Sequence, residues 1–265
     1  MKYARTLKKL NSQIVAILPD DHKAILESAS EMMAGEYDPS LFDDSLPVYQ
    51  ELGNVAIINI QGTIFPTCTK LEKTLGAVSC KEVRLAVKKA RESEVENVIF
   101  NINSGGGVVQ GVDETADAMR DLGKVKNTYT YCDEVMASAA YWLGSQANTV
   151  LAGKSAVVGS IGVYLSIMTN QVALENEGVE ITTIQAGTHK TLGISSKTLN
   201  DEEKGYLQAG VDKTYLEFTA AISHRGLDVS NQQGEVYEGQ EMEDRKLIDM
   251  FQSDFDELVM YLNNQ

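Results

Sequence analysis

The sequence is short of positive charge. Its 265 residues include 23 lysines and arginines against 38 aspartates and glutamates, which gives a formal net charge of −15. A nucleic-acid-binding protein needs a basic face, and an anionic membrane surface attracts basic segments in the same way. The composition therefore argues against nucleic acid as a partner and against binding to an anionic membrane. It also favours solubility.

Long apolar runs are also missing. No stretch approaches the roughly 18 uninterrupted apolar residues of a membrane-spanning helix. Residues 1–10 are basic, but polar residues from Asn11 onward leave no apolar segment of the length that a secretory signal needs. We therefore expect a soluble, cytoplasmic chain without a membrane anchor.

Cysteine is scarce, and its pattern excludes two common uses. Cys68, Cys80 and Cys132 are odd in number and have no metal-ligand spacing. An odd count favours a reducing compartment over a disulfide framework, and each thiol is best interpreted as a small buried apolar side chain. Neither a metal-ligand cluster nor a nucleotide-binding motif is present, so we expect no cofactor.

Turn-forming and acidic residues divide the chain in two. Residues 1 to about 35 are expected to be helical in two pieces, separated by Leu18-Pro19-Asp20, and residues 35–48 have the composition of a linker. The predicted organisation is a helical N-terminal segment with an acidic linker over 1–48 and one large domain over 49–265.

Strand and helix patterns alternate through the larger domain. We expect strands at 55–60, 98–102, 128–132, 149–152 and 180–185, with a further β-rich stretch at 156–167. Helices are expected from about 80, over 112–122, 136–146 and 168–177, from 201 to about 223, and over 254–262. Such alternation indicates βαβ units and a mostly parallel sheet.

A glycine turn follows the strand expected at 98–102. The turn reads Asn103-Ser104-Gly105-Gly106-Gly107, and helical sequence begins soon after it. Glycines in such a turn let backbone N–H groups approach an anion, which could be a phosphate or the oxyanion of acyl chemistry. The common phosphate-binding motifs are absent, and no lysine or arginine lies between Asn101 and Met119. A tight turn without chemistry is the alternative.

A serine among small residues is the candidate nucleophile. Ser138 lies in Met-Ala-Ser-Ala-Ala-Tyr, where a helix is expected to begin, although a serine that packs between helices is the alternative. A serine hydroxyl needs a base. Of the three histidines, His22 is expected on the surface and His224 at a helix C-cap, while His189 directly follows a predicted strand.

Four motifs in order resemble the signal peptide peptidase A family of serine–lysine peptidases. They are the Asn103–Gly107 turn, Ala137–Tyr141, Gly159-Ser-Ile-Gly-Val163, and a Gly187–Gly193 loop about fifty residues after the serine. The resemblance covers roughly residues 53–250. It implies a Clp protease/crotonase-like spiral of βαβ units, here with a short helical N-terminal segment added.

The resemblance also implies a catalytic set. Ser138 would be the nucleophile and Lys190 the general base, with His189 as the rival base of a triad. One backbone N–H of Gly106 or Gly107 and that of Ala139 would form the oxyanion hole. Ser160 would steady the lysine, or would be an ordinary turn serine.

Lys190 has to meet a physical condition for this role. A free lysine has a pKa of about 10.4, so a base at neutral pH needs a pKa about 3 units lower, which corresponds to about 4 kcal/mol. Burial in a closed apolar site, finished by a neighbouring subunit, would supply that shift, and a solvated Lys190 would contradict the dyad.

The sequence departs from the family pattern at several positions. Gly105 stands where the family has proline, which is expected to loosen the turn. Ala139 and Ala140 replace glycines, which is expected to narrow the approach to the oxyanion hole, and Glu241 ends a Gly-Gln-Ala-like segment. None of these changes removes a catalytic group.

The functional prediction is a homo-oligomeric serine endopeptidase that cleaves proteins or peptides through an acyl-enzyme. Without an anchor, the chain resembles phage and prophage members that act on scaffold and capsid proteins, in the host cytoplasm or procapsid. The alternatives are a soluble bacterial signal-peptide-peptidase-like protease, a crotonase-like acyl-CoA enzyme and an inactive assembly homologue.

Overall fold

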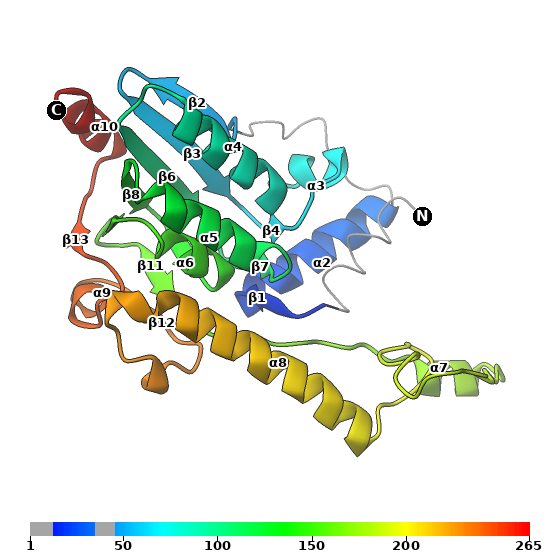
Figure 1. Ribbon diagram of the computed structural model, residues 1–265. Helices are drawn as coiled ribbons and strands as arrows, with labels where there is room; N and C mark the ends of the chain where they lie inside the picture. The colour runs from blue at the N-terminus through cyan, green and yellow to red at the C-terminus, as the bar shows by residue number, and fades with distance from the viewer. Residues whose placement is uncertain (1–12, 35–45) are drawn as a thin grey trace.

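The computed structural model describes residues 13–34 and 46–265 (Figure 1). Its largest sheet has the strand order β13-β10-β8-β6-β3-β2 and is parallel except at the β2–β3 pair. The strands are β2 (Tyr49–Leu52), β3 (Val55–Gln61), β6 (Asn97–Asn103), β8 (Asn127–Cys132), β10 (Thr149–Ala152) and β13 (Met250–Phe251). This pairing confirms the predicted α/β class with a mostly parallel sheet.

Two smaller sheets surround the glycine turn. One has the order β1-β7-β4-β5 and the other β12-β11-β9. Their strands are β1 (Val15–Ile17), β4 (Ile64–Phe65), β5 (Val78–Ser79), β7 (Gly106–Val108), β9 (Val135–Ala137), β11 (Val157–Gly159) and β12 (Val236–Tyr237). Within them, β1–β7 and β11–β12 are antiparallel and the other pairs are parallel.

Helices cover both faces of the large sheet. Helices α4 (Cys80–Glu92) and α5 (Val112–Leu122) lie side by side on one face (Figure 1). On the other face, α10 (Phe255–Asn263) packs its apolar side chains against alternate residues of β3, β6, β8 and β10. A strand covered on both faces has a continuous apolar sequence, which explains the run from Val55 to Ile60.

Helix α6 (Ala139–Gly144) is buried along its whole length and anchors the long helix α8 (Asp201–Ile222). The Trp142 ring on α6 stacks on Phe218 of α8, with ring centroids 4.8 Å apart. At its other end α8 begins with a capping box in which Asn200 and Glu203 bond reciprocally. The N-terminal half of α8 extends away from the body of the protein (Figure 1).

Residues 163–199, called the arm below, connect β11 to α8 and project from the body beside the free end of α8 (Figure 1). Every residue from Gly162 to Glu202, all within the described chain, is at least partly exposed. The arm contains the short helix α7 (Gln171–Asn176). The expected strand at 180–185 is wrong, because this segment lies exposed with no strand edge to pair with.

The remaining helices are α2 (Pro19–Ala34) and the short α3 (Lys70–Thr74) and α9 (Gln240–Asp244), with 3₁₀ turns at Ser223–Arg225 and Val229–Asn231. Helix α2 confirms the second helical piece of the N-terminal segment, and Pro19 is its first residue. Among residues 13–34 and 46–265, no helix is both long and apolar enough to cross a membrane.

Two expected helices differ in the structure. In the first helical piece of the N-terminal segment, Val15–Ile17 is a strand, because its backbone pairs with β7. Residues 1–12 of that piece and residues 35–45 of the linker lie outside the described residues. The helix expected at 136–146 begins only at Ala139, because Val135–Ala137 pairs in parallel with β11.

Candidate active site

Ser138 sits at the junction between strand β9 and helix α6. Its backbone has φ 59° and ψ −122°, a conformation that L-residues rarely adopt. The N–H of Ser138 donates to the Gly159 carbonyl oxygen at 2.8 Å, and its Oγ donates to the Gly162 carbonyl oxygen at 3.4 Å. A strained strand-to-helix turn of this kind fixes the direction of a nucleophilic hydroxyl.

The glycine turn is tied to the strand that leads into Ser138. The Ser104 N–H donates to the Val135 carbonyl oxygen at 2.8 Å, and the Ala137 N–H donates to the Ser104 carbonyl oxygen at 3.1 Å. The Ser104 hydroxyl in turn accepts the Gly106 N–H at 3.1 Å. Ser104, which sequence reasoning did not single out, therefore holds the turn beside Ser138.

Glycine is required at positions 106 and 107 for different reasons. Gly106 has φ +107°, and a methyl group on it would lie 2.2 Å from the Ala16 carbonyl oxygen and 3.0 Å from the Ser138 Cβ. A methyl group on Gly107 would lie 2.0 Å from the Ile64 carbonyl oxygen. The structure therefore packs the Gly106 backbone directly against Ser138, and Gly107 is the next residue of the same strand, β7.

Position 105 contacts the N-terminal helix. A methyl group on Gly105 would lie 1.7 Å from the Asp21 Oδ2, so the missing side chain leaves room for the carboxylate of α2. Burial, with a smaller contribution from the neighbouring Asp20 charge, raises the pKa of Asp21 above its usual range. Sequence reasoning did not find this contact, because nothing local links α2 to the turn.

Ala139 and Ser160 also lie at the Ser138 turn. Ala139 is the first residue of α6 and is fully buried, so its N–H has no carbonyl partner within the helix. Ser160 has φ +51° and follows Gly159, the residue that binds the Ser138 N–H. Its own N–H donates to the Glu235 carbonyl oxygen at 2.6 Å.

The two candidate bases lie on the arm. Lys190 is exposed, and the His189 ring stacks on Tyr206 near the free end of α8, with centroids 4.1 Å apart. The helix segment from Tyr206 to Phe218, which packs beside α6, spans about 18 Å along the axis. Within one chain, therefore, the structure does not bring His189 or Lys190 to the buried Ser138.

Of the other two histidines, the position predicted for His224 is confirmed and that predicted for His22 is wrong. His224 caps the end of α8 as expected, because its Nδ1 lies 3.0 Å from the Ala221 carbonyl oxygen. The surface position expected for His22 is wrong: it is 6% exposed, and its Nδ1 lies 2.6 Å from the Tyr164 hydroxyl. This bond joins α2 to the start of the arm.

The cysteines are structural in the described chain. All three are free thiols, and Cys80 and Cys132 are buried as predicted, whereas Cys68 is partly exposed. Burial raises the pKa of Cys80 to about 11 and that of Cys132 to about 12, which suppresses the reactive thiolate. No group of three potential metal ligands occurs among the residues that the structure describes.

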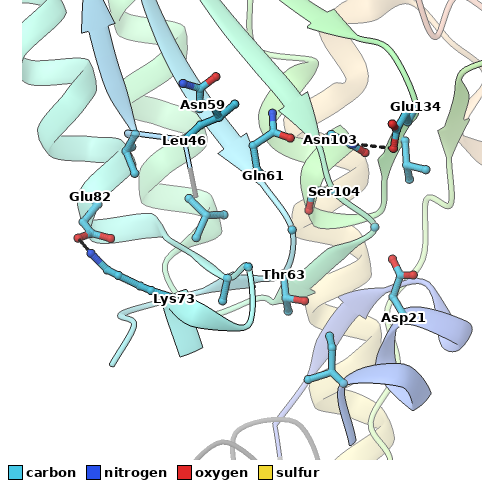
Figure 2. A pocket seen from close by; sticks show the side chains of 18 of the residues that line it. Asp21, Leu46, Asn59, Gln61, Thr63, Lys73, Glu82, Asn103, Ser104 and Glu134 are labelled. Atoms are coloured by element: carbon cyan, nitrogen blue, oxygen red, sulfur yellow. Dashed lines mark hydrogen bonds and ion pairs between the residues drawn. The ribbon is translucent and has the colours of Figure 1, made fainter. Parts of the chain in front are cut away.

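A cavity of about 920 Å³ opens behind the glycine turn, between β3, the turn and α2 (Figure 2). Asn59, Gln61 and Ser104 line it together with Gly105 and Asp21. Near the turn, the Asn103 side chain donates to Glu134 at 2.8 Å (Figure 2). Ser104 and Gly105 of the turn line the cavity, whereas Gly106 and Ser138 are not among its lining residues.

Comparisons with known proteins match the sequence of this chain to peptidases. The profile described as peptidase family S49 matches residues 120–264, which include Ser138 and Lys190. The capsid assembly protease C of Escherichia phage lambda is 29% identical over 76% of this chain and 47% of its own length. The head-tail preconnector protein GP5 of Enterobacteria phage P21 is 27% identical over 83% of this chain and 44% of its own length.

The chain thus spans about half the length of these curated relatives. Among solved structures, an enoyl-CoA hydratase/isomerase family member aligns with a TM-score of 0.46 at 12% identity, covering 82% of this chain and 75% of that one.

Proposed function

The chain belongs to peptidase family S49, and from that premise we propose that it is a serine endopeptidase whose nucleophile is Ser138. The observation that carries the proposal is the strained backbone of Ser138, which is packed against the glycine turn at a strand-to-helix junction. A helix-packing serine would not need a left-handed φ, whereas a nucleophile on such a turn presents its Oγ in one direction.

The reaction follows from the groups around Ser138. Its Oγ attacks the peptide carbonyl carbon while the proton passes to a neutral base, and the carbonyl oxygen becomes an oxyanion. The Ala139 N–H and a glycine-turn N–H stabilise that charge. Gly107 is the better candidate, because the Gly106 N–H already donates to Ser104. The amine leaves with the proton, and water then hydrolyses the acyl-enzyme.

The base is Lys190, supplied by a second copy of the chain. In a single chain Lys190 is exposed on the arm, whereas a lysine that acts as a base has to be shielded from water. The arm also exposes apolar side chains, among them Met168 at 69%, Val172 at 67% and Ile184 at 95%. Exposure on this scale is typical of a surface that another chain covers. Covering the arm would remove water from Lys190 and lower its pKa.

The substrate class is protein, and capsid or scaffold proteins are the proposed targets. Support comes from the likeness to the capsid assembly protease of phage lambda, which covers 76% of this chain. The acidity of the chain argues against nucleic acid as a partner.

The test is cleavage of an unstructured protein by the full-length chain and four variants. Ser138→Ala and Lys190→Ala should each lower the rate by at least about a hundredfold. Lys154→Ala removes an exposed lysine outside the arm and is the matched control. Cleavage that survives Lys190→Ala but is lost in His189→Ala would replace the dyad with a triad. No cleavage by the unmodified chain would refute the proposed function and favour an assembly role.

A further inference from the structure

Strand β1 lies in a narrow groove beside the proposed nucleophile. On one side it pairs antiparallel with β7, with Val15 opposite Val108, Ala16 opposite Gly107 and Ile17 opposite Gly106. On the other side, Val15 and Tyr164 exchange two backbone hydrogen bonds of 2.9 Å. Val15, Ala16 and Ile17 are each at most 2% exposed. A segment of only three residues thus fills a groove between two backbone edges.

The segment reaches the reacting centre through Ala16. The Ala16 carbonyl oxygen and the Ser138 Cβ both lie against the Cα of Gly106, on the side where its methyl group would be. The Ala16 side chain belongs to the core cluster that contains Ala139 and Ala140, the residues after the serine. Val15 and Ile17 point to the opposite side, into a cluster with Phe65. This alternation is that of an extended peptide.

The hydrogen bonds give the register of this peptide. The Val109 N–H donates to the Ile14 carbonyl oxygen at 3.3 Å, and the Leu18 N–H donates to the Gly105 carbonyl oxygen at 2.9 Å. In an antiparallel ladder such pairs recur at every second residue, so Ala16 and Gly107 form the hydrogen-bonded pair between them. The Gly107 N–H, proposed above for the oxyanion, therefore faces the Ala16 carbonyl oxygen.

We propose that β1 is a built-in substrate mimic that occupies the substrate strand site, with Ala16 in the place of the residue before the cut bond. The proposal rests on the proposed function for the meaning of the site, but the groove and its occupant are features of the fold. A substrate enters as an extended strand between β7 and Tyr164 by β-strand addition, and it must displace β1.

The mimic also indicates the substrate class. The position beside Ser138 holds Ala16, which is fully buried in the apolar core cluster, so a larger side chain there would have to displace its neighbours. Its neighbours, Val15 and Ile17, are β-branched and favour the extended backbone. The groove therefore selects extended apolar segments with a small residue before the cut bond.

Contacts of α2 hold the mimic in place. The His22 ring lies 2.6 Å from the Tyr164 hydroxyl, and the Asp21 carboxylate rests on Gly105. These contacts join the start of α2 to both walls of the groove. Because β1 and α2 are linked through Leu18, movement of α2 away from the body would withdraw β1 and open the site.

The test is a full-length Ala16→Glu variant, compared with Ala24→Glu on the exposed face of α2. A carboxylate at position 16 cannot be buried in this apolar cluster without a partner, so it expels β1. Both variants are also made with Ser138→Ala, so that a bound peptide is not cut. A fluorescein-labelled peptide with the sequence of residues 13–20 is titrated into each by fluorescence anisotropy.

The Ala16→Glu chain should bind this peptide more than about tenfold more tightly than the Ala24→Glu chain, because a tethered strand competes at an effective concentration in the millimolar range. With Ser138 present, Ala16→Glu should also cleave an unstructured protein faster than the unmodified chain. If Ala16→Glu binds the peptide but no variant cleaves protein, the proposal that β1 is a substrate mimic stands and the proposed peptidase activity is refuted. Equal, weak binding by both variants would overturn the mimic.

If Ala16→Glu does not fold, amide hydrogen exchange of the unmodified chain tests instead whether β1 can leave its groove. A displaceable mimic opens locally, so the amides of Val15, Leu18 and Tyr164 should exchange at least tenfold faster than those of the central strand β6. Exchange of these amides only with global unfolding would show that β1 is a permanent strand and would overturn the proposal.

Discussion

Replacement of Gly106 with alanine tests the close packing around Ser138. The new methyl group would lie 2.2 Å from the Ala16 carbonyl oxygen, 3.0 Å from the Ser138 Cβ and 3.1 Å from the Ala137 carbonyl oxygen. Two of these neighbours are backbone atoms that cannot rotate away. We therefore expect Gly106→Ala to destabilise the fold and to push β1 out of its groove.

The expected loss in the free energy of unfolding has two parts. A left-handed backbone costs alanine about 1–2 kcal/mol relative to glycine. Forcing a methyl group into a filled site costs about 1–3 kcal/mol more. Gly106→Ala should therefore lower the free energy of unfolding by about 2–5 kcal/mol.

A matched glycine separates the two parts. Gly234 has φ +96°, close to the +107° of Gly106, and a methyl group on it would have no neighbour within 4 Å. Gly234→Ala therefore has the backbone cost without the contacts, and both variants restrict the unfolded chain equally. Urea unfolding should show Gly106→Ala less stable than Gly234→Ala by about 1–3 kcal/mol. Equal stability of the two variants would refute the packing of Ser138, Gly106 and Ala16 described above.

Two further predictions concern the helix that carries the arm. Trp142→Ala removes a fully buried ring that stacks on Phe218, and it should lower the free energy of unfolding by about 3–5 kcal/mol in the same assay; an unchanged urea midpoint would contradict this anchoring. The Lys197 ammonium, together with the Asn200 N–H, holds the pKa of Glu203 below its usual range. A lowered pKa in the folded state stabilises the fold above the unfolded value and loses that effect as the pH falls. Glu203→Gln should therefore lower the melting temperature at pH 7 and have little effect near pH 3, and a pH-independent difference would argue against the Lys197 contact.

The elements that form from their own residues were predictable. Strand β6 comes from a short β-branched apolar run, and α5 from apolar positions at a helical period with charges opposite. Helix α8 begins at the predicted cap, Asn200, and ends within one residue of the predicted position. In each case, local periodicity and capping agree with the tertiary environment.

Elements that depend on distant partners were not predictable. Val135–Ala137 has an apolar sequence directly before an alanine-rich helix start, but it becomes a strand by pairing with β11. Val15–Ile17 becomes a strand only because β7 offers it a free edge. Conversely, the β-branched segment at 180–185 finds no edge within the chain and forms no strand.

The candidate site also has residues whose position was predictable and residues whose position was not. The family resemblance implied that Ser138, Ala139 and a glycine of the turn lie together, and the structure does pack Gly106 against Ser138, which Ala139 directly follows. The resemblance also implied that Lys190 is the base, but its position in space depends on where the arm leads, and in one chain it is exposed and not brought to Ser138. The arm follows α8 away from the body of the protein (Figure 1).

Mixing two inactive variants tests the central claim most directly, namely that Ser138 and Lys190 of different copies form one catalytic site. Ser138→Ala and Lys190→Ala chains are unfolded together, refolded as a mixture and assayed on an unstructured protein. Random assembly should pair an intact Ser138 with an intact Lys190 at about a quarter of the sites, and activity should return in that proportion. A mixture as inactive as either variant alone, beside a refolded unmodified chain that cleaves, would contradict the account.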